Sequence, residues 1–591
     1  MNLNLKNFAV PFIFIFLIFT LNSQESLKSI EEDYYDFLSL TGVVKRPTLG
    51  YRSLSDNVWT FNEIESFEKN EEVTFTKVRT SGEQSPTHIW KNNNLGTTYT
   101  LWQPASPIDN WFTRGIKQNF TVRIYGPEWF NSYNTATPYG QNDGALWQGR
   151  GYNTSLTAGL RLEGYGFELT VKPQVSFSQN KAFQLVDNSS FYTNEFGYIW
   201  GYGNDKGADA PQRFGDKAFW TYDWGDSEIR WSWYNLTLGF GTQSPWLGPA
   251  WLNPLLHSNN AATYPKFDIG LRKTQIYIPY INYYIGDIEF RFWIGKLSES
   301  DYFDNDSSND HNQITGMTLS YSPFFLPGLT LGINKICISK WDDNEFYKYF
   351  NPFYGTSGAA SGNEVEDQKI SITLNWLVPK GGIDVYAEFG FDDHINARDT
   401  INSYTTHYWH TFTYTFGLKK AFDIYKKGNI SGEILFEWNN TEMSQDFQMQ
   451  YNYCFGFHHI ITQGFTNKGQ WLGSGIGYGG QSQYLGCKIY YPKGLSHIYI
   501  HRYNPDNSYL FKEAINDVST GANGDLHNRT WNFYKGILTI GVDSDYYITE
   551  DFRLGAGLAY CHIVNPIYNQ ADEQYLVWHN FRFSFSAKYN F

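Results

Sequence analysis

The chain ends in Phe581-Arg-Phe-Ser-Phe-Ser-Ala-Lys-Tyr-Asn-Phe591, a stretch in which apolar and polar residues alternate without interruption. The odd positions carry phenylalanine, alanine and tyrosine, whereas the even positions carry arginine, serine, lysine and asparagine. Successive side chains of a β-strand point to opposite faces, so the pattern predicts a strand with one aromatic face and one polar face. A soluble sheet could contain such a strand, but the mostly aromatic face and the aromatic last residue favour a strand that faces lipid.

The same alternation recurs along most of the chain. It is clearest in the ranges 120–124, 288–294, 369–376, 383–391, 412–418 and 433–438. We count roughly sixteen to nineteen such segments, and closure of a single-chain bacterial barrel favours an even number. Together with the aromatic end, the pattern resembles bacterial outer-membrane β-barrels, whose closing strand serves the barrel assembly machinery. For residues 113–591 we therefore predict an all-β transmembrane fold, an antiparallel outer-membrane β-barrel of about 18 strands in contact with outer-membrane lipid.

Composition agrees with a barrel and argues against other classes. The chain has 45 tyrosines and 21 tryptophans, and rings with a polar tip are what interfacial girdles require. A mean hydropathy of -0.47 argues against a helical membrane protein but not against a barrel, because only alternate strand residues face lipid. The net charge of -14 and the lack of a basic block argue against nucleic acid as a partner.

The first residues predict export. Lys6 precedes an apolar run from Phe8 to Leu21, which matches the core of a signal peptide. A bilayer-spanning helix needs about twenty residues, and this run is shorter. We assign residues 1–24 to a signal peptide and expect the protein in the bacterial cell outer membrane.

Residues 25–112 differ from the rest of the chain. Apolar residues at 27, 30, 34, 37 and 38 have helical spacing, and Gly42 stands where a helix would end. We predict a small, partly helical N-terminal subdomain on the periplasmic side that plugs the barrel. A set of irregular strands and loops is the alternative.

The polar faces of the predicted strands carry charges of both signs. In a barrel these side chains point into the lumen, which would be polar; they are Arg123, Arg230, Glu289, Arg291, Asp384, Glu388, Glu433 and Arg582.

Three blocks are denser in Trp, Gly, Asn and Pro than barrel strands require: 137–151, 245–261 and 458–482. Saccharides bind to a flat ring under their C–H face and to paired donors and acceptors on their hydroxyls. The competing interpretation is that tryptophan marks the interfacial girdle while asparagine and glycine mark turns. The candidate glycan-binding residues are Asn142, Asp143, Trp147, Gln148, Trp246, Trp251, Asn259, Asn260, Gln463, Gln470 and Trp471.

These blocks resemble the Wzi capsule-assembly family, outer-membrane proteins that hold capsular or exopolysaccharide at the cell surface. The most specific parts are Asn142-Asp-Gly-Ala-Leu-Trp-Gln-Gly149 and Ser258-Asn-Asn-Ala261. The likeness extends to Glu366-Asp-Gln368 and to Val385-Tyr-Ala-Glu-Phe-Gly-Phe-Asp-Asp-His394. The resemblance implies a barrel of about eighteen strands with a helical piece on the periplasmic side. It also implies capsular or exopolysaccharide as the partner, bound without catalysis.

Two other functions stay open at this point. A porin-like channel for small polar solutes would use the polar lumen. A barrel hydrolase has little support, because no G-x-S-x-G motif is present. We expect no cofactor and no metal: the four cysteines form no CxxC, and the Asp304–Asp310 run lacks the glycine and glutamate of an EF-hand.

Overall fold

The structure, a computed structural model, describes eleven ranges of the chain. They are 29–61, 97–188, 194–199, 207–304, 306–351, 366–392, 411–444, 455–505, 507–508, 535–568 and 576–591. The predicted signal peptide, residues 1–24, lies outside them. Among the described residues, no helix combines the length and the apolar character needed to cross a bilayer.

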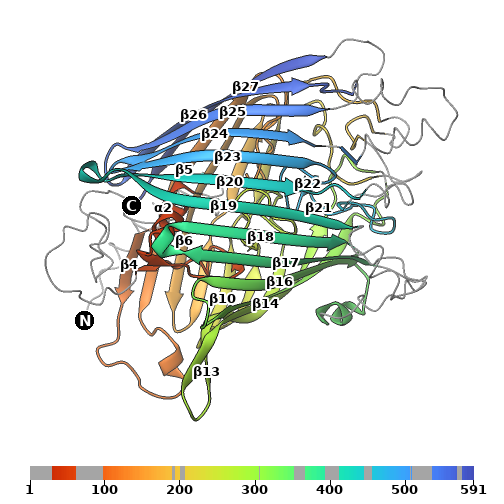
Figure 1. Ribbon diagram of the computed structural model, residues 1–591. Coiled ribbons are helices and arrows are strands. Elements are labelled where there is room, and N and C mark those ends of the chain that lie inside the picture. The colour runs from red at the N-terminus through yellow and green to blue at the C-terminus, as the bar shows by residue number, and fades with distance from the viewer. Residues whose placement is uncertain are drawn as a thin grey trace, which may run out of the picture.

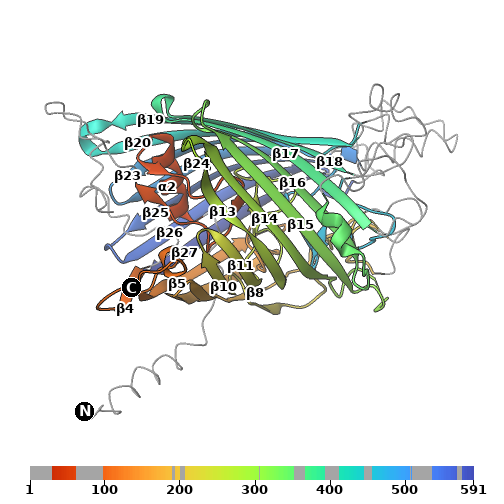
Figure 2. The ribbon, with the colours of Figure 1, turned by 90° about the horizontal axis from the view of Figure 1, so that it is seen from below.

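Eighteen antiparallel strands close into a barrel (Figures 1 and 2). Two of the eighteen are interrupted, one formed by β7 and β8 and the next by β9 and β10, and β27 pairs with β5 to close the ring. In chain order the strands are β5 (Phe120–Asn134), β6 (Gly151–Gly164), β7 (Phe167–Val171), β8 (Gln174–Ser178), β9 (Phe219–Asp223), β10 (Glu228–Trp233), β11 (Leu236–Gly241), β13 (Lys266–Ile278), β14 (Tyr283–Ser298), β15 (His311–Pro323), β16 (Leu329–Lys340), β17 (Glu366–Val378), β18 (Ile383–Asp392), β19 (Phe412–Tyr425), β20 (Ile430–Asn440), β23 (Gln481–Tyr491), β24 (Gly494–Asn504), β25 (Gly536–Tyr547), β26 (Phe552–Val564) and β27 (Val577–Tyr589).

Shorter elements complete the chain. They are α2 (Ile30–Leu40), β1 (Val44–Lys45), β2 (Tyr51–Arg52), β3 (Thr60–Phe61), β4 (Thr97–Trp102), β12 (Trp246–Leu247), β21 (Thr466–Asn467), β22 (Gln470–Trp471) and the 3-10 helices η1 (Thr113–Gly115), η2 (Phe346–Phe350), η3 (Pro379–Gly381) and η4 (Lys426–Gly428).

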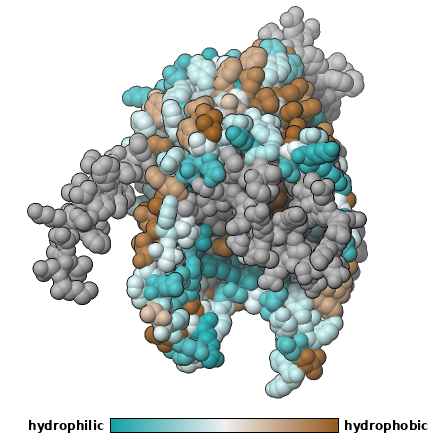
Figure 3. All heavy atoms as spheres, turned by 90° about the vertical axis from the view of Figure 1, so that its left-hand side faces the viewer, coloured by the Kyte–Doolittle hydropathy of each residue, from teal (hydrophilic) through white to brown (hydrophobic). Residues whose placement is uncertain are grey.

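The alternation in the sequence corresponds to the two faces of the barrel. In β27, Phe583 is 51% exposed on the outer face, whereas Lys588 is buried inside. The other alternating segments lie in β5, β14, β17, β18, β19 and β20. Viewed onto one end, the barrel has hydrophobic side chains on its outer flanks and hydrophilic ones around the central hollow (Figure 3). The predicted outer-membrane β-barrel is therefore confirmed.

The two ends of the barrel differ in the length of their connections. One end has tight turns, such as Tyr234–Asn235 between β10 and β11 and residues 379–382 between β17 and β18. The other end has the long connections 135–150, 179–218, 242–265 and 441–480. In barrels of this class short turns face the periplasm and long loops face outward. Helix α2 lies at the short-turn end, inside the barrel (Figure 2).

Helix α2 begins and ends at residues suited to those positions. The Ser29 hydroxyl accepts a hydrogen bond from the Glu32 backbone N–H at 3.2 Å, and three acidic residues occupy the first turn. At the other end Gly42 has φ +76°, and the Val43 N–H donates to the Leu38 carbonyl at 2.9 Å. This is a Schellman ending, in which glycine adopts the left-handed conformation at least cost. The helix expected from the apolar spacing is thus present.

Ion pairs and ring stacking hold α2 against the inner wall. Phe37 stacks on Tyr490 of β23 with ring centroids 4.4 Å apart. The Glu31 carboxylate pairs with Arg553 at 3.3 Å and Lys588 at 3.4 Å, and it accepts a hydrogen bond from Tyr547 at 2.9 Å. Burial alone would raise the pKa of Glu31, but the two cations outweigh it and hold this pKa at about 2. Glu31 is therefore bound as an anion.

The chain beyond α2 continues into the lumen and meets an external connection there. Strand β2 pairs with β12, which belongs to the 242–265 connection from the other end of the barrel. The Glu289 carboxylate of β14 accepts the backbone N–H groups of Leu49, Gly50 and Tyr51 at 2.7–3.1 Å. Protein from both ends therefore fills the middle of the barrel.

The lumen-facing charges are arranged in ion pairs. Arg230 of β10 contacts Asp268 at 2.6 Å and Glu228 at 2.7 Å. Arg291 contacts Asp268 at 2.7 Å and Asp56, from the segment after β2, at 2.6 Å. Removing one partner of such a buried pair is costly, because the other charge is left uncompensated. The network thus fixes the N-terminal segment to the wall as well as satisfying the wall itself.

Part of the predicted 25–112 subdomain joins the barrel sheet instead of the lumen. Strand β4 pairs with the first residues of β5, next to the stretch of β5 that pairs with β27. Residues 62–96 lie outside the described residues. A periplasmic plug made of the whole of 25–112 therefore stays a prediction, although α2 and β2 occupy the lumen.

Glu32, the residue after Glu31, provides a test of how α2 is bound to the barrel. Glu32 is buried and accepts hydrogen bonds from Asn57 at 2.6 Å and Trp59 at 2.9 Å, both at the same oxygen. Burial raises the pKa of Glu32 to about 7 from its usual 4.5. Because the folded-state pKa is the higher one, ionisation removes roughly 3 kcal/mol of docking free energy as the pH rises from about 4.5 to about 7. A glutamine can accept both hydrogen bonds without a charge.

We therefore expect Glu32→Gln to leave α2 protection unchanged at pH 4.5 and to increase it at pH 8. Amide hydrogen exchange of residues 30–40 in the folded, detergent-bound protein measures this. Equal protection of variant and wild type at pH 8 would contradict the prediction.

Candidate functional site

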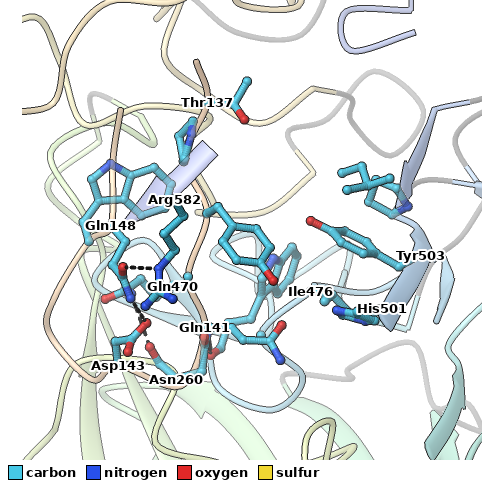
Figure 4. A pocket seen from close by; sticks show the side chains of 18 of the residues that line it. Thr137, Gln141, Asp143, Gln148, Asn260, Gln470, Ile476, His501, Tyr503 and Arg582 are labelled. Carbon is cyan, nitrogen blue, oxygen red and sulfur yellow. Dashed lines mark hydrogen bonds between the residues drawn. The ribbon is translucent and has the colours of Figure 1, made fainter. Parts of the chain in front are cut away.

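A cavity of about 500 Å³ lies in the barrel at the end with the long connections. Its loop side is formed by parts of the 135–150, 179–218, 242–265 and 441–480 connections. Its wall side is formed by inner-face residues of β23, β24, β25, β26 and β27. Figure 4 shows side chains from both sides pointing into the same space.

The 135–150 connection is bound to the 242–265 connection through asparagines. Asn142 has φ +60°, a conformation that asparagine tolerates. Its backbone N–H donates to Asn260 at 3.0 Å, and its side-chain amide donates to the Leu252 carbonyl at 3.1 Å. The Gly144 N–H donates to the Asn259 carbonyl at 2.8 Å. These contacts place the tip of one connection directly beside the other.

A chain of polar groups crosses one side of the cavity. Arg582 of β27 donates from Nε to the Gln148 amide oxygen at 3.2 Å, and the Gln148 amide nitrogen donates to Asp143 at 2.6 Å (Figure 4). Because the guanidinium can only donate and the carboxylate can only accept, these contacts fix the orientation of the Gln148 amide between them.

Two tryptophans border the same space. Trp147 packs on Phe214 with centroids 5.0 Å apart, and its indole nitrogen has no protein acceptor among the described residues. Trp471 is held edge-on by Tyr198 and Tyr478. The backbone carbonyl of Trp471 accepts a hydrogen bond from Asn260 at 3.0 Å, which links the 441–480 connection to the 242–265 connection.

The opposite wall is an aromatic row along β24. His497, Tyr499, His501 and Tyr503 alternate with outward Ile498, Ile500 and Arg502, and Tyr484 of β23 stands beside them. Neighbouring ring centroids lie 4.9–5.6 Å apart along this row. We name these five residues the aromatic row. They were not among the predicted site residues, although inward rings at every second position were the available signal.

Seven of the eleven predicted glycan-binding residues line this cavity: Asp143, Trp147, Gln148, Trp251, Asn260, Gln470 and Trp471. The other four do not. Asn142 and Asn259 are buried in the contact between connections, and Trp246 is buried and borders a second cavity. Gln463 is fully buried, donates to the carbonyls of Ser298 and Thr466, and accepts from Asn312. These four residues hold the connections that carry the cavity.

A second cavity, of about 420 Å³, lies at the short-turn end between α2, the N-terminal segment and the wall. Trp251 lines both cavities, so the segment that carries it forms the partition between them. The Trp251 indole donates to Asp33 of α2 at 3.2 Å, and Lys488 lies 4.5 Å from its ring centroid. The partition is therefore bound to the helix below it.

One wall carboxylate holds the backbone of this partition. Glu437 of β20 accepts the N–H groups of Trp251, Leu252 and Asn253 at 2.8–3.0 Å. Tyr386 donates to the same carboxylate at 2.8 Å, and its ring lies over Gly417, where a Cβ would come within 1.9 Å of the ring. Glycine at 417 is thus required for Tyr386 to support Glu437.

The described residues hold no group of three or more His, Cys, Asp or Glu placed to bind a metal. His257 is an example of a histidine with a packing role. It is buried between the Pro245 carbonyl and the Tyr264 hydroxyl, each at 2.8 Å, and burial lowers its pKa to about 4. A neutral His257 thus joins the two ends of the 245–264 segment.

A closed barrel of 18 antiparallel strands with an apolar outer face defines the protein as an outer-membrane β-barrel, here with protein packed in its lumen. The family model for capsule assembly protein Wzi matches residues 134–575. The chain belongs to this family and to the outer membrane.

Solved structures with the same architecture include the Wzi outer-membrane protein of Escherichia coli, described as involved in group 1 capsule assembly and as a carbohydrate-binding β-barrel. It shares 12% identity, covers 97% of this chain and 99% of its own, and has a TM-score of 0.55. OprB of Pseudomonas putida has 9% identity, covers 80% of this chain and 94% of its own, and has a TM-score of 0.34. OccAB2 of Acinetobacter baumannii has 11% identity, covers 79% of this chain and 98% of its own, and has a TM-score of 0.35. No match was found among curated protein sequences.

Proposed function

We propose that this protein binds capsular or exopolysaccharide without catalysis and anchors it at the cell surface. The observation that carries the proposal is the cavity among the external connections, with two tryptophans and a chain of amide and charged groups on one side and the aromatic row on the other. Rings offer flat surfaces to the C–H face of a sugar, and the polar groups offer donors and acceptors to its hydroxyls. Carbohydrate binding by the Wzi barrel of Escherichia coli supports this assignment.

The filled lumen favours binding over conduction. Below the cavity, the partition around Trp251 is held by Glu437 and by Asp33 of α2. A porin-like channel would need an open path through this region. The polysaccharide would therefore bind at the outer end of the barrel and would not pass through the lumen.

Two further partners belong to the proposal. Outer-membrane lipid would contact the exposed apolar outer face, and the barrel assembly machinery would act on the closing strand β27 and the aromatic residues Tyr589 and Phe591. Phe591 is 51% exposed, so it is accessible for recognition.

Binding of the surface polysaccharide extracted from the producing cells, measured on the purified protein, tests the proposed function. We expect Trp147→Ala and Gln470→Ala each to weaken binding, the former by about five- to tenfold for the loss of about 1 kcal/mol of ring contact. Trp220→Ala is the matched control, because Trp220 lies in β9, close to the same end, but is exposed on the outer face. Absence of binding by the wild type, together with unchanged capsule retention after deletion of the gene, would overturn the proposal.

A further inference from the structure

One arginine in the cavity has its two terminal nitrogens unused. Arg582 is held at Nε by Gln148, and its guanidinium lies 5.7 Å from the Phe130 ring centroid and 5.9 Å from that of Tyr139. Within the described part of the chain, neither terminal nitrogen donates to a protein acceptor, and no carboxylate lies within ion-pair distance of the guanidinium. The side chain is thus fixed in place while four of its five N–H donors have no protein acceptor among the described residues.

The neighbouring groups explain how the arginine stays unpaired. Gln148 is neutral, and it separates Arg582 from Asp143 because its amide is bonded to both. Asp543 of β25 lines the same cavity and is the carboxylate that attracts the guanidinium most, but it lies beyond ion-pair distance and makes no hydrogen bond to the described residues. The cavity therefore contains a cationic and an anionic group that attract each other without direct contact. Buried arginines of the lumen, such as Arg230 and Arg291, are instead paired with carboxylates.

A guanidinium binds a carboxylate with two parallel N–H···O hydrogen bonds, which is the strongest and most specific contact available to it. A carboxylate oxygen pair would satisfy both terminal nitrogens of Arg582 at once. Sugar hydroxyls, in contrast, both donate and accept, so the acceptor that suits them here is Asp543.

From this arrangement, and resting on the proposed function, we infer that the cavity is specific for an acidic sugar residue, a uronate. Its carboxylate binds the terminal nitrogens of Arg582, its ring hydroxyls face Asp543, and its C–H face lies against the aromatic row. The polysaccharide that this protein anchors is therefore an acidic one.

The test compares one polymer in two chemical states. The surface polysaccharide of the producing cells is bound to the purified full-length protein before and after carbodiimide–borohydride reduction, which converts each carboxylate to a hydroxymethyl group. We expect the native polymer to bind at least tenfold more tightly than the reduced one. Arg582→Gln should remove this preference. Arg582→Lys should keep part of it, because the positive charge remains but the paired N–H donors of the guanidinium are lost. Asp543→Asn should increase the preference, because it removes a negative charge that repels the carboxylate of the sugar.

Arg502→Gln is the matched control. Arg502 also donates to a glutamine side-chain oxygen, that of Gln483 at 2.6 Å, but on the outer face of β24. Equal binding of native and reduced polymer, or a polymer without acidic sugars, overturns the inference and leaves the proposed function standing. No binding of either polymer overturns both. An unchanged preference in Arg582→Gln, in a variant that still migrates as a folded barrel, also overturns it.

Discussion

Replacing Glu31 with lysine is expected to detach helix α2 from the barrel wall. The glutamate is fully buried and pairs with Arg553 and Lys588, so a lysine would place a third cation in the same space and lose the hydrogen bond from Tyr547. Removing one partner of a buried pair already costs about 3–5 kcal/mol, and the new repulsion adds to that. Residues 30–40 should therefore lose hydrogen-exchange protection by at least two orders of magnitude, while the strands stay protected.

Controls distinguish loss of docking from general damage. Asp109→Lys reverses one charge of the Asp109–Arg114 pair, which is exposed outside the lumen, and should change nothing measurable. Glu31→Lys combined with Arg553→Glu restores a pair of opposite charges and should recover part of the protection. Full protection of α2 in Glu31→Lys alone would show that the ion pairs do not hold the helix.

The barrel could be predicted from the sequence because its physical cause is local. Every second side chain of a spanning strand must be apolar, and this leaves a period of two wherever a strand crosses. The end of α2 could also be predicted, because Gly42 signals a left-handed residue wherever the helix packs.

The site was only partly predictable, because its polar contacts join residues far apart in the chain. Trp147 and Trp246 lie in similar sequence surroundings, yet Trp147 borders the cavity while Trp246 donates to the Ala250 carbonyl and is buried. Trp246 cannot reach a ligand in the cavity because its strand, β12, pairs with β2, and this pairing joins segments from opposite ends of the barrel. The sequence predicted that Arg582 faces the lumen, but it did not indicate the hydrogen bond to Gln148, which lies 434 residues earlier in the chain.

The aromatic row was missed for a different reason. Tyr499 and Tyr503 alternate with residues that face lipid, and rings at such positions also occur in interfacial girdles. Alternation gives two faces but does not say which one is inside when both carry large side chains, as with Tyr499 beside Ile500. Only the closed barrel decides this.

The second large effect concerns conduction through the lumen. In planar bilayers the wild type should show almost no current, because the partition around Trp251 separates the two cavities and α2 and β2 occupy the space below. Replacing residues 245–261 with a short Gly/Ser linker removes β12, the partition and the backbone that Glu437 holds. The cavities of about 500 and 420 Å³ would then join, and we expect stable ionic current.

A point substitution tests the same closure of the lumen in case the linker variant does not fold. Glu437→Ala leaves three backbone N–H groups of the partition without their acceptor, each costing about 1–3 kcal/mol, so brief openings should appear as flickering current. Shortening the connection between β14 and β15 at residues 306–310, where side chains such as Asp306 are exposed, should leave the baseline unchanged. A wild-type current as large as that of the linker variant would contradict a closed lumen. Such a current would favour a porin-like channel over a polysaccharide anchor. A barrel that conducts freely has no partition that could hold a polysaccharide at its outer end.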